Sequence, residues 1–260
     1  MSKVIAIANQ KGGVGKSTTA INLSSCLAEA HKRVLVIDMD PQGNTTSGLG
    51  MDKNNLEYSI YDLLLGDCKL KECIKHISFK SIIKKSLDLL PSNVNLSGAE
   101  IELLDVEDRE HTLERKIESI RDKYDFIIID CPPSLSILTL NALSAADSVM
   151  IPTQCEYYAL EGLGQLLQTI QIVRERVNEK LQVEGIVFTM FDGRTNLSQE
   201  VVDSVKQNLD EYCFKAVIPR NVRLAEAPSY GLPINIYEKK SEGAKAYKSL
   251  AKELVKKNKK

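Results

Sequence analysis

The sequence of 260 residues contains no apolar run as long as a membrane span, and its formal net charge is only −1. Its first residues are strand-like and unlike a secretion signal, so we expect a cytoplasmic protein. A charge near zero excludes a global field that attracts the whole protein to DNA or lipid, so any such binding requires a local patch. Internal repeats, low-complexity segments and linkers rich in proline or glycine are absent before the lysine-rich end, which predicts a single domain over residues 1–260.

The cysteines include no Cys-x-x-Cys pair. Cys68 and Cys73 lie close together in the sequence, and His76 is the one histidine near them at a spacing familiar from zinc sites. We expect reduced and mostly buried thiols, as in most cytosolic proteins. The six cysteines are Cys26, Cys68, Cys73, Cys131, Cys155 and Cys213.

Short apolar runs alternate with helical patterns, as in a parallel sheet covered by helices on both faces. Helices are predicted at residues 59–65 and 108–121, and an amphipathic stripe over residues 160–177 predicts a longer one. The acids of residues 100–110 are interpreted as a solvated helix face. The predicted fold is α/β, a single doubly wound, mostly parallel sheet with helices on both faces. The expected strands are residues 4–8, 34–37, 87–90, 126–129, 148–151, 185–189 and 216–218.

The first of these strands leads into a glycine-rich stretch that is followed by helix-forming residues. The stretch reads Lys11-Gly12-Gly13-Val14-Gly15-Lys16-Ser17-Thr18. A strand, a glycine-rich turn and a helix form the context of a phosphate-binding loop, in which backbone N–H groups point at an anion. We expect Lys16 to contact the outer phosphates and the Ser17 hydroxyl to bind Mg²⁺.

Two other predicted strands end in acids. The second continues into Asp38-Met39-Asp40-Pro41-Gln42-Gly43-Asn44, and the fourth into Asp130-Cys131-Pro132-Pro133-Ser134. Ligands of open α/β sheets bind at the carboxyl ends of the strands, so these acids should lie beside the phosphate loop. Asp130 has the Walker B arrangement, in which the acid holds Mg²⁺. Asp40 is our choice for the group that orients the attacking water, and the alternative is Asp38.

The glycine-rich loop departs from the usual pattern, because Gln10 replaces its first glycine and Lys11 is a second lysine. This form resembles the deviant Walker A family of P-loop NTPases, which includes ParA and Soj partition ATPases, MinD, nitrogenase iron proteins and iron–sulfur scaffold ATPases. The segment around Asp40 is similar to the ParA-family switch I motif. The resemblance covers nearly the whole chain and is weakest between residues 51 and 123. Three further stretches look like chromosomal ParA (Soj) proteins: residues 154–162, 190–197 and 218–229.

This resemblance implies an ATPase that uses ATP and Mg²⁺ as cofactors and forms a homodimer when ATP binds. Lys11 would reach across the dimer to the partner's nucleotide, and Gly12 would have to stay small because the partner backbone approaches there. The loop Pro219–Asn221 would contact the base, with a backbone contact from Pro219 and a side-chain amide from Asn221. The implied catalytic residues are Lys11, Lys16 and Asp40, and the implied metal ligands are Ser17 and Asp130.

The resemblance also implies binding to nucleoid DNA and hydrolysis stimulated by a ParB-like centromere-binding partner, in the segregation of a chromosome or plasmid. Arg194 and Arg223 match family positions that line a basic surface of the ATP dimer. Contacts to phosphates make such binding sequence-independent and sensitive to salt. Because the chain begins at its first strand, we expect no N-terminal helix-turn-helix domain like that of larger plasmid ParA proteins. Residues that could extend the patch are Lys206, Lys215 and Arg220.

The main alternative is a MinD-like positioning ATPase that binds membrane through a basic amphipathic C-terminal helix. A helix is predicted at about residues 242–257, followed by a lysine-rich tail. We favour a helix docked on the sheet, because alanine and tyrosine insert weakly into membranes. A third alternative, an iron–sulfur carrier ATPase, is opposed by the missing Cys-x-x-Cys pair. The apolar face of the predicted helix contains Ala244, Tyr247, Ala251, Leu254 and Val255.

Overall fold

The computed structural model describes residues 2–79, 87–209 and 212–259. In chain order its strands are β1 (Lys3–Ile7), β2 (Val34–Asp38), β3 (Lys75–His76), β4 (Leu87–Leu90), β5 (Phe126–Asp130), β6 (Ser148–Gln154) and β7 (Gln182–Thr189). In these ranges they form a seven-stranded sheet with the order β3-β4-β2-β5-β1-β6-β7. Neighbouring strands are parallel except for β3 and β4, which are antiparallel. The predicted α/β fold with a mostly parallel sheet is therefore confirmed.

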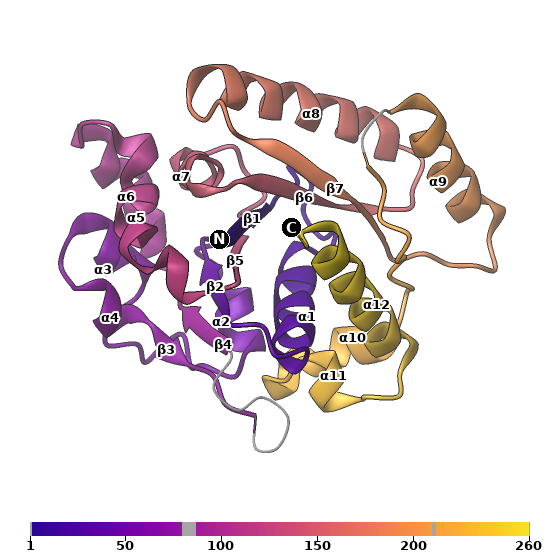
Figure 1. Cartoon of the computed structure of the whole chain (residues 1–260), viewed down its shortest axis with the longest axis horizontal. Coiled ribbons are helices and arrows are strands. Elements are labelled where there is room, and N and C mark those ends of the chain that lie inside the picture. Colours follow the sequence, from indigo (N-terminus) through magenta and orange to yellow (C-terminus); the bar gives the residue numbers. More distant parts are fainter. Residues whose placement is uncertain (1, 80–86, 210–211, 260) are drawn as a thin grey trace.

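Helices cover both faces of this sheet (Figure 1). The α-helices are α1 (Lys16–Glu29), α2 (Asn44–Gly48), α3 (Ile60–Leu65), α4 (Leu70–Cys73), α5 (Leu96–Glu102), α6 (Thr112–Ile117), α7 (Ile137–Ala145), α8 (Ala159–Arg176), α9 (Asn196–Asn208), α10 (Val222–Glu226), α11 (Ile234–Tyr237) and α12 (Glu242–Lys257). The 3₁₀ helices are η1 (Leu103–Asp105), η2 (Arg109–His111), η3 (Glu118–Lys123) and η4 (Ala227–Tyr230). The helices predicted at residues 59–65, 160–177 and 242–257 correspond to α3, α8 and α12.

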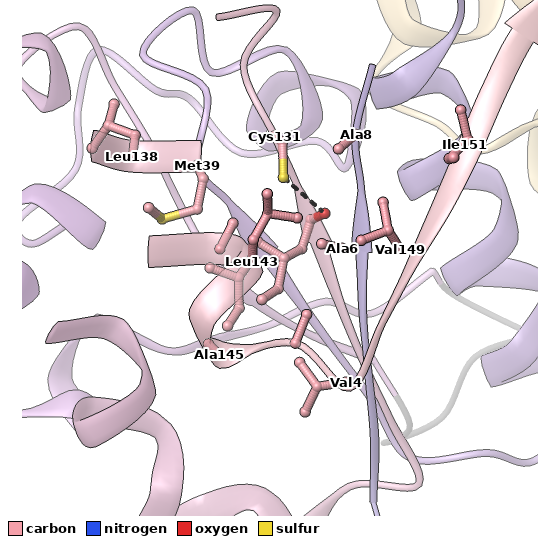
Figure 2. Close-up of a cluster of buried hydrophobic side chains, with 14 of the residues drawn as sticks. Val4, Ala6, Ala8, Met39, Cys131, Leu138, Leu143, Ala145, Val149 and Ile151 are labelled. Carbon is pink, nitrogen blue, oxygen red and sulfur yellow. Dashed lines mark hydrogen bonds between the residues drawn. The ribbon is translucent and has the colours of Figure 1, made fainter. Parts of the chain in front are cut away.

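The sheet separates two apolar cores, because alternate side chains of a strand point to opposite faces. From β1, Val4 and Ala6 pack with α7 and α8, whereas Ile5 and Ile7 pack with α1 and α12. Figure 2 shows the first core around Cys131, directly after β5. Burial of both faces explains why β2 and β5 read as continuous apolar runs, and each run ends in an aspartate.

Two secondary-structure predictions were wrong. Residues 216–218 form no strand. They lie between two residues that form isolated bridges, Cys213 with Ile186 of β7 and Pro219 with Phe191. Pro219 has no N–H to continue a ladder. The helix predicted over residues 108–121 is divided into η2, α6 and η3, and Asp108 before it has a left-handed backbone with φ +54°. The strand β3 was not predicted, since two residues give no periodic signal.

The cysteine prediction was wrong for one pair. Cys68 and Cys73 form a disulfide, because the turn between α3 and α4 brings together two residues only five positions apart. Cys26, Cys131 and Cys155 are buried, as expected. Burial raises the pKa of the Cys26 thiol to about 12 and the pKa of Cys155 to about 11, so both thiols resist ionisation.

The C-terminal helix α12 is docked against α1, as favoured from the sequence (Figure 1). Tyr247 is buried, and its hydroxyl lies 3.2 Å from Thr19 Oγ1 of α1. Ser241 caps the helix by accepting a hydrogen bond from the Ala244 N–H at 3.1 Å. The apolar face of α12 is thus part of the protein core. Across residues 2–79, 87–209 and 212–259, no helix combines the length and apolar character that crossing a membrane requires.

Candidate active site

The glycine-rich loop connects β1 to α1 and lines a cavity of about 580 Å³. Gly13 and Gly15 have φ values of +75° and +90°, in the left-handed region that glycine adopts without strain. The Thr19 N–H donates to the Gly15 carbonyl at 2.9 Å and starts the hydrogen bonds of α1. The loop therefore wraps the N-terminus of a 14-residue helix, where free N–H groups and the helix dipole favour an anion.

Lys16 brings a cation to the wall of this cavity. Its side chain is nearly buried, with 6% of the residue exposed, and its Nζ donates to the Lys11 carbonyl at 3.0 Å. Burial lowers the pKa of Lys16, and the nearby charge of Asp130 acts in the opposite direction. A buried cation beside open backbone donors is suited to bind phosphate.

The register of the sheet brings the predicted acids together. Asp130 of β5 is aligned with Ile7 of β1 and with Asp38 of β2, so both acids lie at the carboxyl ends of these strands, next to the loop. Asp130 Oδ2 accepts a hydrogen bond from Thr45 Oγ1 at 2.7 Å, whereas its Oδ1 is buried without a hydrogen-bond partner among the described residues. Burial, and then the charge of Asp38, raise the pKa of Asp130, and the hydrogen bond from Thr45 opposes the rise.

The two acids of the Asp38–Asp40 segment have different environments. Asp38 is fully buried, and its Oδ2 accepts from the N–H and the hydroxyl of Thr46 at 2.8 and 2.7 Å. Burial raises the pKa of Asp38 despite these bonds. Asp40 lines the cavity, and its Oδ1 accepts from the Gln42 N–H at 2.9 Å. Of the two, Asp40 is the one in contact with the space that a ligand can enter.

A second cavity, of about 280 Å³, adjoins the first at Gly15 and Thr18. Pro219 and Asn221 line it, where the sequence predicted a base-binding loop. Asn221 Oδ1 accepts a hydrogen bond from the Arg223 N–H at 2.9 Å and caps α10, so the orientation of its amide is fixed. The predicted phosphate-binding and base-binding segments therefore both line this second cavity, although they are more than 200 residues apart in the sequence.

Lys11 has a different environment from Lys16. Its half-exposed side chain forms an ion pair with Glu156 in the turn between β6 and α8. At the neighbouring Gly12, an added Cβ would meet nothing within 4 Å. This part of the loop is therefore accessible from outside the chain.

The structure places Arg194 and Arg223 on segments whose backbones are joined, because the Arg220 N–H donates to the Phe191 carbonyl at 2.9 Å. Both side chains are exposed and already paired: Arg194 with Asp192 at 2.6 Å, and Arg223 with Glu226 at 2.8 Å. The Arg194 guanidinium holds the pKa of Asp192 well below its usual range.

Sequence reasoning missed several residues of the site. Thr45 orients Asp130, Thr189 Oγ1 donates to the Val14 carbonyl at 2.9 Å, and Lys53 lines the larger cavity. The position of Thr45, directly after the Asp38–Asn44 motif, was the one available signal. The others depend on contacts that are distant in the sequence or lie outside any motif.

Comparison with known proteins agrees with this geometry. Residues 2–183 match a family model described as an AAA domain. The chain is 53% identical over 255 residues to the sporulation initiation inhibitor protein Soj of Bacillus subtilis, covering 98% of this chain and 99% of that protein. It is 48% identical over 258 residues to the chromosome partitioning protein ParA of Myxococcus xanthus, covering 99% and 89%.

Two solved structures have the same fold. Cobyrinic acid a,c-diamide synthase from Mycobacterium smegmatis, with a bound ATP analogue and magnesium, is 38% identical with a TM-score of 0.85, covering 98% of this chain and 95% of that one. The cell division ATPase MinD of Pyrococcus furiosus is 28% identical with a TM-score of 0.81, covering 98% and 99%. By sequence over nearly its whole length and by the architecture of its site, the chain belongs to the Soj/ParA family of chromosome-partitioning ATPases.

Proposed function

We propose that this chain hydrolyses ATP with Mg²⁺ and that its ATP-bound dimer binds nucleoid DNA without sequence preference. A ParB-like partner stimulates hydrolysis and releases the dimer, and the cycle segregates a chromosome or plasmid. The observation that supports this most is the cavity between the glycine-rich loop and Asp40, with Lys16 in its wall. The partition proteins of high identity support the biological role.

A divalent cation fits the residues at the carboxyl end of β5. The buried Asp130 Oδ1 has no hydrogen-bond partner among the described residues, and burial of this carboxylate without a cation is unfavourable. Ser17 and Asp130 would hold Mg²⁺, which when bound neutralises charge that develops on the phosphates. The N–H groups of residues 13–18 bind the phosphates, Lys16 contacts the outer ones, and Asp40 orients the attacking water.

The accessible position of Lys11 and Gly12 supports a role in the dimer. In one chain the half-exposed Lys11 ammonium pairs with Glu156, so an acceptor on a partner competes with that acid. In the dimer we expect Lys11 to leave Glu156 and contact the partner's nucleotide. Such a contact supplies charge to the transferred phosphoryl group from across the interface, as an arginine finger does.

Gly12→Val is expected to bind ATP but not to dimerise. The added Cβ meets nothing within 4 Å in the single chain, and Gly12 does not have a left-handed backbone, so the loop tolerates valine. A partner backbone at this position, in contrast, would collide with the branched side chain.

Light scattering with ATP measures the dimer, and calorimetric titration measures binding. Gly164→Val in α8, which also points into open space, is the matched control. An ATP-dependent dimer of Gly12→Val would contradict the proposed interface.

Arg194→Ala and Arg223→Ala are expected to weaken DNA binding while ATP binding and dimerisation persist, because neither residue lines the nucleotide cavity. Each substitution removes one contact per subunit, so the slope of log affinity against log salt should fall by about 1.8 for the dimer. Filter binding over a range of salt concentrations gives this slope.

Arg33→Ala is the matched control for the DNA experiment. Arg33 is also exposed and paired with an acid, Asp125 at 3.2 Å. It precedes β2, however, and so lies at the amino-terminal end of the parallel strands, opposite the nucleotide cavity. It should leave the salt slope unchanged. DNA binding by the ADP-bound protein that equals binding by the ATP form would refute the dimer switch.

The MinD-like alternative has weaker support, because the apolar face of α12 is buried against α1. Membrane binding through this helix would require the loss of contacts such as Tyr247 with Thr19. Co-sedimentation of the ATP-bound protein with DNA and, separately, with anionic liposomes distinguishes the two functions. Sedimentation with liposomes alone would favour the membrane function.

A further inference from the structure

Lys53 lies outside every motif of the sequence described above, yet it lines the same cavity as the phosphate loop and Asp40. It follows α2 in the segment where the family resemblance is weakest. In the wall of this cavity it is a second lysine besides Lys16, and it faces the loop of residues 40–44.

The side chain of Lys53 lies across that loop. Its Nζ donates to the Gln42 carbonyl at 2.6 Å. A Cβ built on Gly43 would lie 3.0 Å from Lys53 Cδ and 2.9 Å from the Ser92 carbonyl oxygen, so Gly43 is packed between the two. With φ at +61°, Gly43 also occupies a conformation that side chains disfavour.

One residue connects Lys53 to Asp40. Gln42 donates its N–H to Asp40 Oδ1 at 2.9 Å and accepts at its carbonyl from Lys53. The orientation of Gln42 therefore depends on both bonds, and through it the direction of the Asp40 carboxylate depends on Lys53. The Asp40 backbone is held separately, since Ser92 Oγ donates to its carbonyl at 2.8 Å.

We propose that Lys53 is a positioning residue for ATP hydrolysis, because it holds the loop that directs the Asp40 carboxylate into the cavity. This inference rests on the proposed role of Asp40. Lys53 acts on the rate of the chemical step rather than on nucleotide affinity, since it lies outside the phosphate loop and its amine donates to the loop that carries Asp40. Small displacements of a catalytic group can reduce rates by large factors, which is why a loop clamp affects turnover.

The test is steady-state hydrolysis by Lys53→Met, which keeps most of the aliphatic stem over Gly43 and removes the donor. We expect kcat to fall about tenfold with KM changed by less than about twofold. Lys53→Arg retains a donor for the Gln42 carbonyl and should recover most of the activity. Lys75→Met is the matched control, because Lys75 Nζ also donates to a backbone carbonyl, that of Glu72 at 2.9 Å, away from the cavity.

Each other outcome overturns the inference. A higher KM with unchanged kcat would assign Lys53 to nucleotide binding, and unchanged kinetics would leave it no role. A loss that Lys53→Arg does not reverse would show that the bond to Gln42 is not the cause. Asp40→Ala is measured in parallel: if it retains hydrolysis, the proposed function itself fails, whereas its inactivity beside a fully active Lys53→Met refutes only the role of Lys53.

Discussion

Lys16→Ala should lose most ATP binding at concentrations that just saturate the unsubstituted protein. Lys16 is a nearly buried cation in the wall of the phosphate cavity, and no neighbouring backbone N–H can replace its charge. A hydrogen bond to a charged group contributes up to about 3 kcal/mol, which corresponds to a loss of about 10²-fold in affinity. Isothermal titration with ATP and Mg²⁺ measures this loss directly.

The fold should survive the substitution of Lys16. Burial lowers the pKa of Lys16, so the charged amine has an unfavourable desolvation energy that alanine removes. Circular dichroism should therefore show a native spectrum without nucleotide. Lys75→Ala removes a lysine that donates to a carbonyl in the same manner, and it should bind ATP normally. Near-native ATP affinity of Lys16→Ala would refute the assignment of the phosphate loop.

The parts of the site that the sequence predicted are those encoded locally. The glycine-rich loop is a continuous stretch between a strand and a helix, and the acids of β2 and β5 directly end apolar runs. Their meeting follows from parallel pairing, which aligns Asp38 with Asp130. The rule that ligands bind at the carboxyl ends of parallel strands was therefore sufficient to predict that the phosphate loop and both acids lie together.

The parts that were missed depend on contacts between distant segments. Thr45 bonds to Asp130 across 85 positions, and Thr189 to Val14 across 175. The segment of residues 216–218 has the composition of a strand, but only the placement of its neighbours determines that pairing is limited to isolated bridges at Cys213 and Pro219, on either side of it. Lys53 belongs to no pattern at all, and its position follows from the path of the chain after α2.

The ion pairs of the two arginines could have been predicted. Arg223 and Glu226 are three residues apart on one helix, a spacing that places side chains on the same face. Asp192 lies two residues before Arg194 in a turn. Any DNA phosphate must therefore compete with these acids for the arginines. Because this competition weakens each contact, we expect DNA binding to need the contacts of both subunits of the dimer.

Asp40→Ala should separate ATP binding from hydrolysis. The phosphate loop, Lys16 and Asp130 are unchanged, so ATP still binds and the dimer still forms. The attacking water loses the carboxylate that orients and polarises it, and hydrolysis should fall about 10²-fold or more. Phosphate release in the presence of DNA and the ParB-like partner measures turnover, and light scattering measures the dimer, which should accumulate on DNA.

The control for Asp40→Ala is Glu72→Ala. Glu72 Oε2 also accepts from a backbone N–H, that of Lys69 at 2.8 Å, but Glu72 is exposed and does not line the cavity. Loss of such a bond alone should therefore leave hydrolysis unchanged. If Asp40→Ala hydrolyses ATP at the normal rate, another group orients the water. Asp38 is then a poor substitute, because its carboxylate is fully buried and bound to Thr46.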